Sequence, residues 1–97
     1  MKFEDLKFKD DKDNLPVVRA LVDFDKFHLS IIKRTNVPND WYEAAILDAK
    51  NDKFLNLPGI NEVNDVIPHL TPNKVTALIN KLKGFTGNEP KQVKKIK

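Results

Sequence analysis

Residue types that can perform nucleophilic, acid–base or metal chemistry are few in this sequence and widely spaced. The only serine, Ser30, lies in the run LSIIK, which lacks the glycines of a nucleophile elbow and so does not support acyl transfer. His28 and His69 are far apart and form neither an HxxxH nor an HxH pair, the spacings that bring two imidazoles to one metal ion. We interpret each histidine as a structural residue.

Other familiar chemistries also lack their residues. Cysteine is absent, which excludes thiolate nucleophiles, disulfides and cysteine-bound metals, and three glycines are too few for a phosphate loop or a dinucleotide fingerprint. Asp23 and Asp25 share a strand face beside a turn and are interpreted as solubilising charges. In the segment DAKNDKFLNLPG, which begins at Asp48, lysine occupies both the position where a calcium loop needs an oxygen ligand and the position where it needs glycine. We therefore expect no catalytic residue, no metal site and no cofactor, and predict that the protein is not an enzyme.

The segment KRTNVPNDWY brings cations and aromatic rings around a polar loop. Such combinations are enriched at protein interfaces and on platforms that stack single-stranded nucleic acid. The candidate partner-binding residues are Lys33, Arg34, Trp41 and Tyr42. In a plainer interpretation the two rings cap the edge of the core while the two cations stay in water.

The C-terminus EPKQVKKIK is rich in lysine. The candidate phosphate contacts are Lys91, Lys94, Lys95 and Lys97. From residue 87 onward the chain holds these four lysines and one glutamate, which together equal its whole net charge of +3. The remainder is balanced, unlike a nucleic-acid domain with its cations on one face of the folded body. The competing interpretation is a flexible basic tail over residues 87–97 that binds nothing.

Length and composition predict one soluble domain. The chain has 97 residues, of which 40% are hydrophobic and 32% charged, enough for a single core. We expect residues 1–86 to form this domain, with 1–14 as a charged leader that could add an edge strand. No apolar run approaches the roughly 20 residues that cross a bilayer, and no signal peptide is recognisable. These features predict a cytoplasmic protein that does not enter a membrane.

Period-two alternation of apolar residues predicts an antiparallel sheet. Residues 17–24 and 27–34 each place their apolar side chains on one face, and Asp25-Lys26 offers a turn between them. Residues 41–49 carry apolar groups on both faces, which is typical of a central strand, and 53–57 follow as a shorter strand. The expected sheet is a meander of three to five strands.

The segment HLTPNKVTALINKLKGF predicts an α-helix. Thr71 is a good N-cap, Pro72 suits the first helical position, and Gly84 is expected to end the helix. One apolar stripe follows the i, i+3, i+4, i+7 spacing and consists of Val75, Leu78, Ile79 and Leu82. We expect the stripe to pack on the sheet, the alternative being that it docks into another molecule. A short helix over residues 61–67 should precede this one and end at Pro68. The predicted fold class is therefore α+β.

Residues 27–83 carry a resemblance to a known group of proteins. The strand HLSIIK, the hairpin WYEAAILDAKNDKFL and the segment DVIPHLTPNKVTALINKL follow one another in that order. This succession resembles small uncharacterised proteins encoded by bacteriophages and prophages, in which a YE-A-VL strand precedes a D-V-I-x-x-LT-x-x-x-V helix. The resemblance implies a viral accessory protein and supplies no catalytic residues.

Two functional hypotheses follow. The first is a non-enzymatic interaction protein of phage type in the cytoplasm of a bacterial host. It would bind a host or viral protein through the Trp41/Tyr42 edge or the exposed face of the sheet. The alternative is a nucleic-acid accessory protein whose basic tail, with Lys33 and Arg34, contacts phosphates. An open sheet edge would also permit a homodimer.

Overall fold

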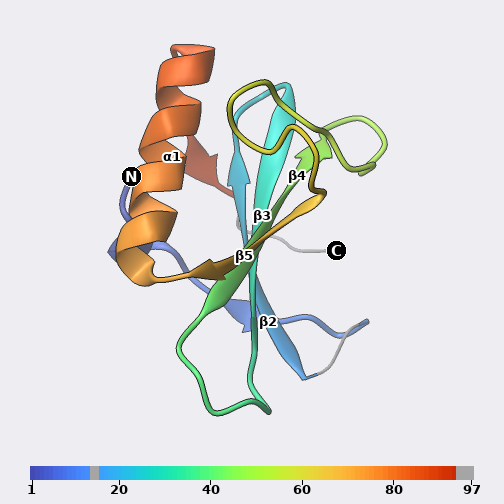
Figure 1. Ribbon diagram of the computed structural model, residues 1–97, viewed down its shortest axis with the longest axis vertical. Coiled ribbons are helices and arrows are strands. Elements are labelled where there is room, and N and C mark those ends of the chain that lie inside the picture. Colours follow the sequence, from blue (N-terminus) through green and yellow to red (C-terminus); the bar gives the residue numbers. More distant parts are fainter. Residues whose placement is uncertain (14–15, 94–97) are drawn as a thin grey trace.

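The computed structural model describes residues 1–13 and 16–93. Its elements are η1 (Phe3–Asp5), β1 (Lys9–Asp10), β2 (Val17–Asp23), β3 (Phe27–Arg34), β4 (Tyr42–Asp48), β5 (Val66–Leu70), α1 (Pro72–Thr86) and β6 (Lys91–Gln92). The strands form an antiparallel sheet in the order β1-β2-β3-β4-β5, and β6 also pairs with β2. Figure 1 shows α1 lying along one face of this sheet. The predicted α+β class, a meander packed against a C-terminal helix, is confirmed.

The three long strands are those that the alternation predicts. β2 pairs with β3 from Val17↔Arg34 to Asp23↔His28 without a break. β4 lies between β3 and β5, an interior position that agrees with its apolar residues on both faces. The register is set because one face of each strand must meet the core, and a slip of one residue would turn every side chain over.

The predicted strand over residues 53–57 is wrong in extent, since it contributes a single bridge, from Phe54 to β4. The side chain of the buried Asn61 takes the backbone groups instead. Its Oδ1 accepts the N–H of Leu57 at 2.7 Å, and its Nδ2 donates to the carbonyl of Leu55 at 2.8 Å. Local bonds of this kind compete with a strand ladder, so the segment folds as a loop.

The predicted short helix before α1 is wrong in position. The described residues 61–67 contain bends and the start of β5, and the short helix that the chain does form is η1, near the N-terminus. Pro68 lies within β5, which is an outer strand where a missing N–H is tolerated. His69 has a φ of 60°, and the pairing of β5 with β4 shifts register nearby. Both features make the edge at β5 a poor template for pairing with a strand of a second copy.

The apolar stripe of α1 is buried on the sheet, as predicted. Its four residues, Val75, Leu78, Ile79 and Leu82, are the buried residues of the helix. They belong to one core with the inward-facing residues of the strands, among them Val22, Leu29, Ile31 and Ile46. Each such side chain contributes about 1.5–3 kcal/mol on leaving water, so this contact is the main source of stability.

The helix begins where predicted and ends later. The hydroxyl of Thr71 accepts the N–H of Lys74 at 3.3 Å, which confirms the N-cap. Gly84, the predicted C-terminal residue, lies inside the helix. The left-handed conformation belongs to Gly87, with a φ of 75°, and its N–H donates to the carbonyl of Lys83 at 2.8 Å. Because the helix continues, Phe85 is exposed rather than folded back on the stripe.

Both ends of the described chain lie along the outer edge of β2. β1 pairs with the first half of β2, and β6 pairs with the second half of β2. The side chain of Gln92 joins the two ends, since it accepts the N–H of Lys7 at 2.7 Å and donates to the carbonyl of Lys7 at 2.5 Å. This edge of the sheet is therefore covered by the chain itself.

The predicted flexible tail differs from the structure in its first part. Residues 87–93 pack against the domain, with Pro90 buried and Lys91 in β6. The other three tail lysines, Lys94, Lys95 and Lys97, lie outside the described residues. No helix in the described part of the chain is long and apolar enough to span a membrane.

Glu89 fastens the described C-terminal segment to the helix. Its carboxylate lies 2.5 Å from the ammonium of Lys83 and 3.0 Å from the amino group of Met1. The hydrogen bond from Lys83, followed by that from Met1, lowers the pKa of Glu89 below its ordinary value.

We predict that Ala at the two glycines of this helix end has opposite effects. Gly84→Ala should raise the free energy of unfolding by about 0.5–1 kcal/mol, since Gly84 is helical and has open space around it. Gly87→Ala should lower it by about 1–2 kcal/mol, because φ is positive there. Urea denaturation of both variants measures the signs. A loss of stability in Gly84→Ala would place the helix end at residue 84 after all.

A second prediction concerns pH. Because the pKa of Glu89 is lowered in the folded state, its ion pairs stabilise the fold above the ordinary glutamate pKa and are lost as pH falls through the lowered value. NMR titration of the Glu89 carboxyl should show this depressed pKa, and Lys83→Ala should return it toward normal. Lys81→Ala is the matched control, since the Lys81 ammonium donates to the carbonyl of Gly59 instead. An unchanged pKa in Lys83→Ala would contradict the assignment.

Candidate functional site

The candidate residue Tyr42 belongs to an aromatic cluster beside the core. Its ring centroid lies 5.0 Å from that of Phe3 and 5.4 Å from that of Phe8. The Lys33 ammonium lies over the same ring, 6.0 Å from its centroid, in a cation–π arrangement. Tyr42 and Lys33 therefore lie on the helix side of the sheet, where the Tyr42 ring packs against the core.

The other two candidate residues point elsewhere. The Nη2 atom of Arg34 lies 3.7 Å from Glu43 on the opposite side of the sheet. Trp41 is half exposed, and its ring meets that of His69 edge-on with centroids 4.6 Å apart. Successive residues of a strand point to opposite faces, so neighbours in sequence such as Lys33 and Arg34 are separated by the sheet. The structure does not bring the four candidate residues together.

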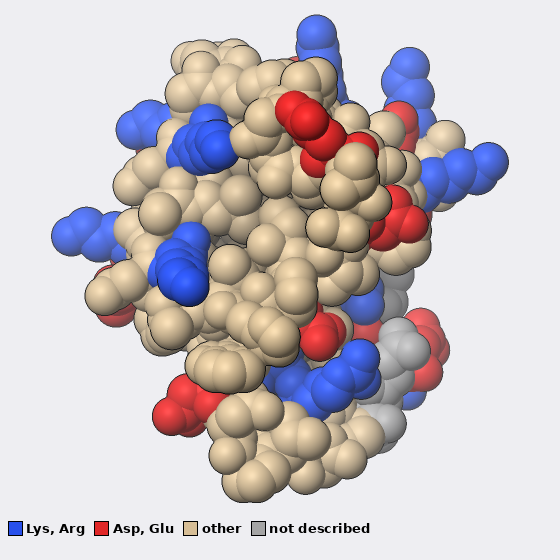
Figure 2. All heavy atoms as spheres, viewed as in Figure 1, with Lys and Arg blue, Asp and Glu red and all other residues tan. Residues whose placement is uncertain are grey.

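The described cations do not form a continuous basic surface on the side shown in Figure 2. Cations over α1, at the left of the view, stand apart from one another, and elsewhere on this side carboxylates lie among the cations. Lys91 stands opposite Asp23 in the register of β6 and β2. Nucleic-acid binding through Lys33, Arg34 and the C-terminal lysines therefore stays a prediction that the described geometry does not strengthen.

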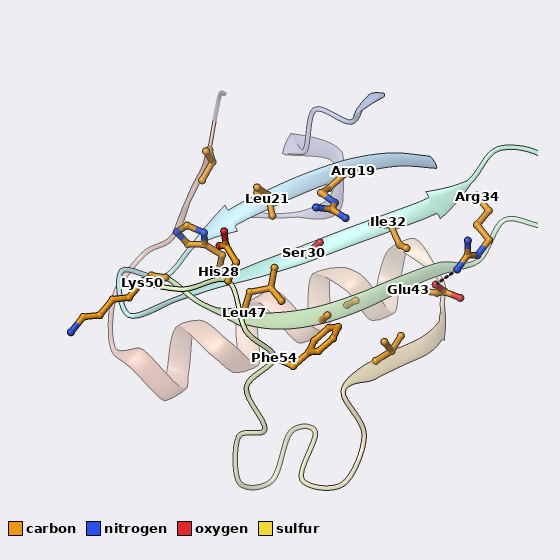
Figure 3. A pocket seen from close by; sticks show the side chains of 16 residues that line it. Arg19, Leu21, His28, Ser30, Ile32, Arg34, Glu43, Leu47, Lys50 and Phe54 are labelled. Atoms are coloured by element: carbon orange, nitrogen blue, oxygen red, sulfur yellow. Dashed lines mark ion pairs between the residues drawn. The ribbon is translucent and has the colours of Figure 1, made fainter. Parts of the chain in front are cut away.

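A larger candidate site is the face of the sheet opposite α1. This face is hollowed, with a cavity volume of about 540 Å³. Ser30 of β3 and Ala45 of β4 pair directly across the sheet, and both line the hollow. Figure 3 shows Leu21 on one side of Ser30 and Leu47 on the other. Because two small side chains stand among larger ones, the surface dips at their position.

The two long sides of the hollow are apolar. On the β4 side they include Phe54, 54% exposed, and Val66, 41% exposed. On the β2 side stands Val93, whose N–H donates to the carbonyl of Leu21 at 2.9 Å. The described C-terminal segment thus supplies part of the wall, a contribution that strand periodicity could not indicate.

One end of the hollow carries two arginines (Figure 3). Arg19 is held by the buried Asp11, with 2.9 Å between Nη2 and Oδ2, and Arg34 pairs more loosely with Glu43. The Nε atom of Arg19 is buried and has no hydrogen-bond partner among the described residues. A buried donor without an acceptor is costly, and the ion pair with Asp11 is what holds the guanidinium in this position.

The opposite end carries residue types that also occur in catalytic triads. The Nε2 atom of His28 lies 3.6 Å from Asp23, and Ser30 follows on the same face two residues along β3. A nucleophile and its base must approach to about 2.6–3.2 Å, and no hydrogen bond joins His28 to Ser30 in the described structure. Nor do three or more potential metal ligands gather among residues 1–13 and 16–93.

Tyr42, the single tyrosine of the chain, allows a direct test of the aromatic cluster. Burial, followed by the charge of Asp40, raises its pKa above the ordinary value of 10.0. Its contribution to stability is therefore complete below the ordinary tyrosine pKa and is lost as pH rises through the raised value. We expect ultraviolet absorbance titration to give a raised pKa that falls when Phe3→Ala opens the cluster. A normal pKa in the folded protein would contradict this packing.

Comparisons of this chain with protein-family models, curated proteins and solved structures found no match. The function must therefore be argued from the geometry of the site.

Proposed function

We propose that this protein is a small non-enzymatic interaction protein that binds another protein on the open face of its sheet. The observation that supports this proposal is the apolar hollow above Ser30 and Ala45. Apolar surface gains about 25 cal/mol per Å² when it leaves water, so a partner that fills the hollow gains affinity from it. Exposed apolar surface with a polar rim commonly marks an interaction site.

The layout of the open face matches the anatomy of a protein interface. Aliphatic side chains occupy the centre, and ion pairs such as Arg34–Glu43 and His28–Asp23 stand at the ends. Interfaces concentrate their binding energy in a desolvated apolar centre, whereas rim charges mainly set specificity and association rate.

We further propose a bacteriophage or prophage origin and a place in the cytoplasm of the bacterial host. The resemblance of residues 27–83 to small phage-encoded proteins supports this part of the proposal. A viral accessory protein of this size acts most simply by occupying a surface of a host or viral protein, and the open face offers such a surface.

Paired substitutions test the proposal. Phe54→Gln and Ala45→Glu alter the hollow, whereas Phe85→Gln and Ala77→Glu make the same changes at exposed positions of α1. We expect the wild-type protein to capture a specific partner from bacterial lysate. Both hollow variants should capture at least about tenfold less of this partner, because the apolar centre is disrupted. Quantitative mass spectrometry measures the captured amounts.

The two α1 variants serve as controls and should retain wild-type capture. Phe54 and Phe85 are almost equally exposed, at 54% and 53%, so loss of a surface ring is matched between them. Thermal unfolding must show that Phe54→Gln is folded. Equal capture by the hollow and α1 variants would refute the open face as the binding surface.

A further inference from the structure

The hollow is a trough that runs along β3. Its floor is formed by side chains that alternate along this strand, namely His28, Ser30, Ile32 and Arg34. At about 3.4 Å per residue, the distance from the first to the last of them is about 20 Å. An α-helix of about 14 residues has this length. On the other face of the same sheet, α1 has 15 residues.

The shape of the trough selects among occupants. A second copy of this chain would present the same concave face, and two hollows facing each other would enclose a void that close packing disfavours. A convex element fills the trough. The open face is therefore better suited to a different protein than to self-association.

Backbone hydrogen bonding favours a helical partner over an extended one. β3 lies inside the sheet and pairs on both sides, with β2 and with β4, so its backbone offers little to an added strand. An extended peptide laid over the apolar floor would leave its own N–H and C=O groups unpaired, which is costly away from water. A helix satisfies these groups internally and offers side chains alone.

Charge gives the helix a direction. Residues directly opposite on paired strands share a face, so Lys9 joins Arg19 on the open face and Lys91 joins Asp23 there. One end thus carries three cations, Arg19, Arg34 and Lys9, and two carboxylates, Asp11 and Glu43. The other end carries two carboxylates, Asp23 and Asp52, and two cations, Lys50 and Lys91, with His28 beside them. Among residues 1–13 and 16–93, the end with the two arginines is the more positive of the two by one charge.

We infer that the partner contributes an amphipathic α-helix that lies along β3, with its C-terminal end, bearing carboxylates, over Arg19 and Arg34. This inference rests on the proposed function and names the chemistry of the partner. The helix dipole places partial negative charge at the C-terminus, which agrees with the same direction. The bound state then has helices on both faces of one sheet, a common layer architecture.

Three synthetic peptides of about 14 residues test the inference. The first has a leucine and alanine stripe, glutamines in its first two turns and glutamates in its last two. The second exchanges the glutamates and glutamines and is otherwise identical. The third replaces one glutamine of the second turn of the first peptide with proline and keeps every leucine, which prevents a continuous helix.

Isothermal titration calorimetry at low salt should show that the first peptide binds about fivefold more tightly than the second. The difference should shrink at high salt because exposed charges are screened. The second peptide is intrinsically the better helix, since its glutamates lie at the N-terminus, so helicity alone predicts the reverse order. The third peptide should bind at least about tenfold more weakly than the first.

Variants of the protein localise the binding. Ala45→Glu and Phe54→Gln should abolish binding of the first peptide, whereas Ala77→Glu and Phe85→Gln should not change it. Arg34→Gln should remove most of the preference for the first peptide over the second.

Equal affinity for the first and third peptides would overturn the helical occupant, and tighter binding of the second would overturn its direction. Absence of binding by all three would also overturn the inference. If lysate capture still depends on Phe54 and Ala45 in that case, the proposed function stands without it. Loss of that dependence would refute the proposed function itself.

Discussion

The structure depends on the burial of one helical stripe against one face of a sheet. Val75, Ile79 and Leu82 of α1 are fully buried against the inward side chains of the strands. A meander with a single covering helix has two faces and closes only one of them. The same contact that stabilises the fold therefore leaves the opposite face available, and the candidate site is a consequence of this asymmetry.

Strand alternation then decides which side chains reach that face. Inward positions of β3 take Leu29 and Ile31, so Ser30 and its neighbours at even positions must face outward. The hollow exists because a small residue of β3 pairs with a small residue of β4. The pairs Arg19–Asp11 and Arg34–Glu43 offset charge at one end, Asp23 stands beside His28 at the other, and the centre remains apolar.

Both edges of the sheet are protected from pairing with a further strand. β1 and β6 cover β2, and Glu89 and Gln92 fasten this arrangement through contacts with residues distant in sequence. The outer strand β5 is short and contains Pro68. Edges of this kind resist further strand pairing.

Local patterns were sufficient to predict β2, β3, β4, the stripe of α1 and the N-cap Thr71, because each depends on periodicity or on neighbouring residues. Sequence alone did not predict β5 and β6, because each forms by pairing with a strand distant in sequence. It also missed the helix end at Gly87 and the loop held by Asn61, because these depend on individual local hydrogen bonds that periodicity does not reveal. The four residues of the candidate patch lie apart for a different reason. Sequence proximity grouped Lys33 with Arg34 and Trp41 with Tyr42, whereas the sheet separates such neighbours and joins Ser30 to Ala45 across two strands.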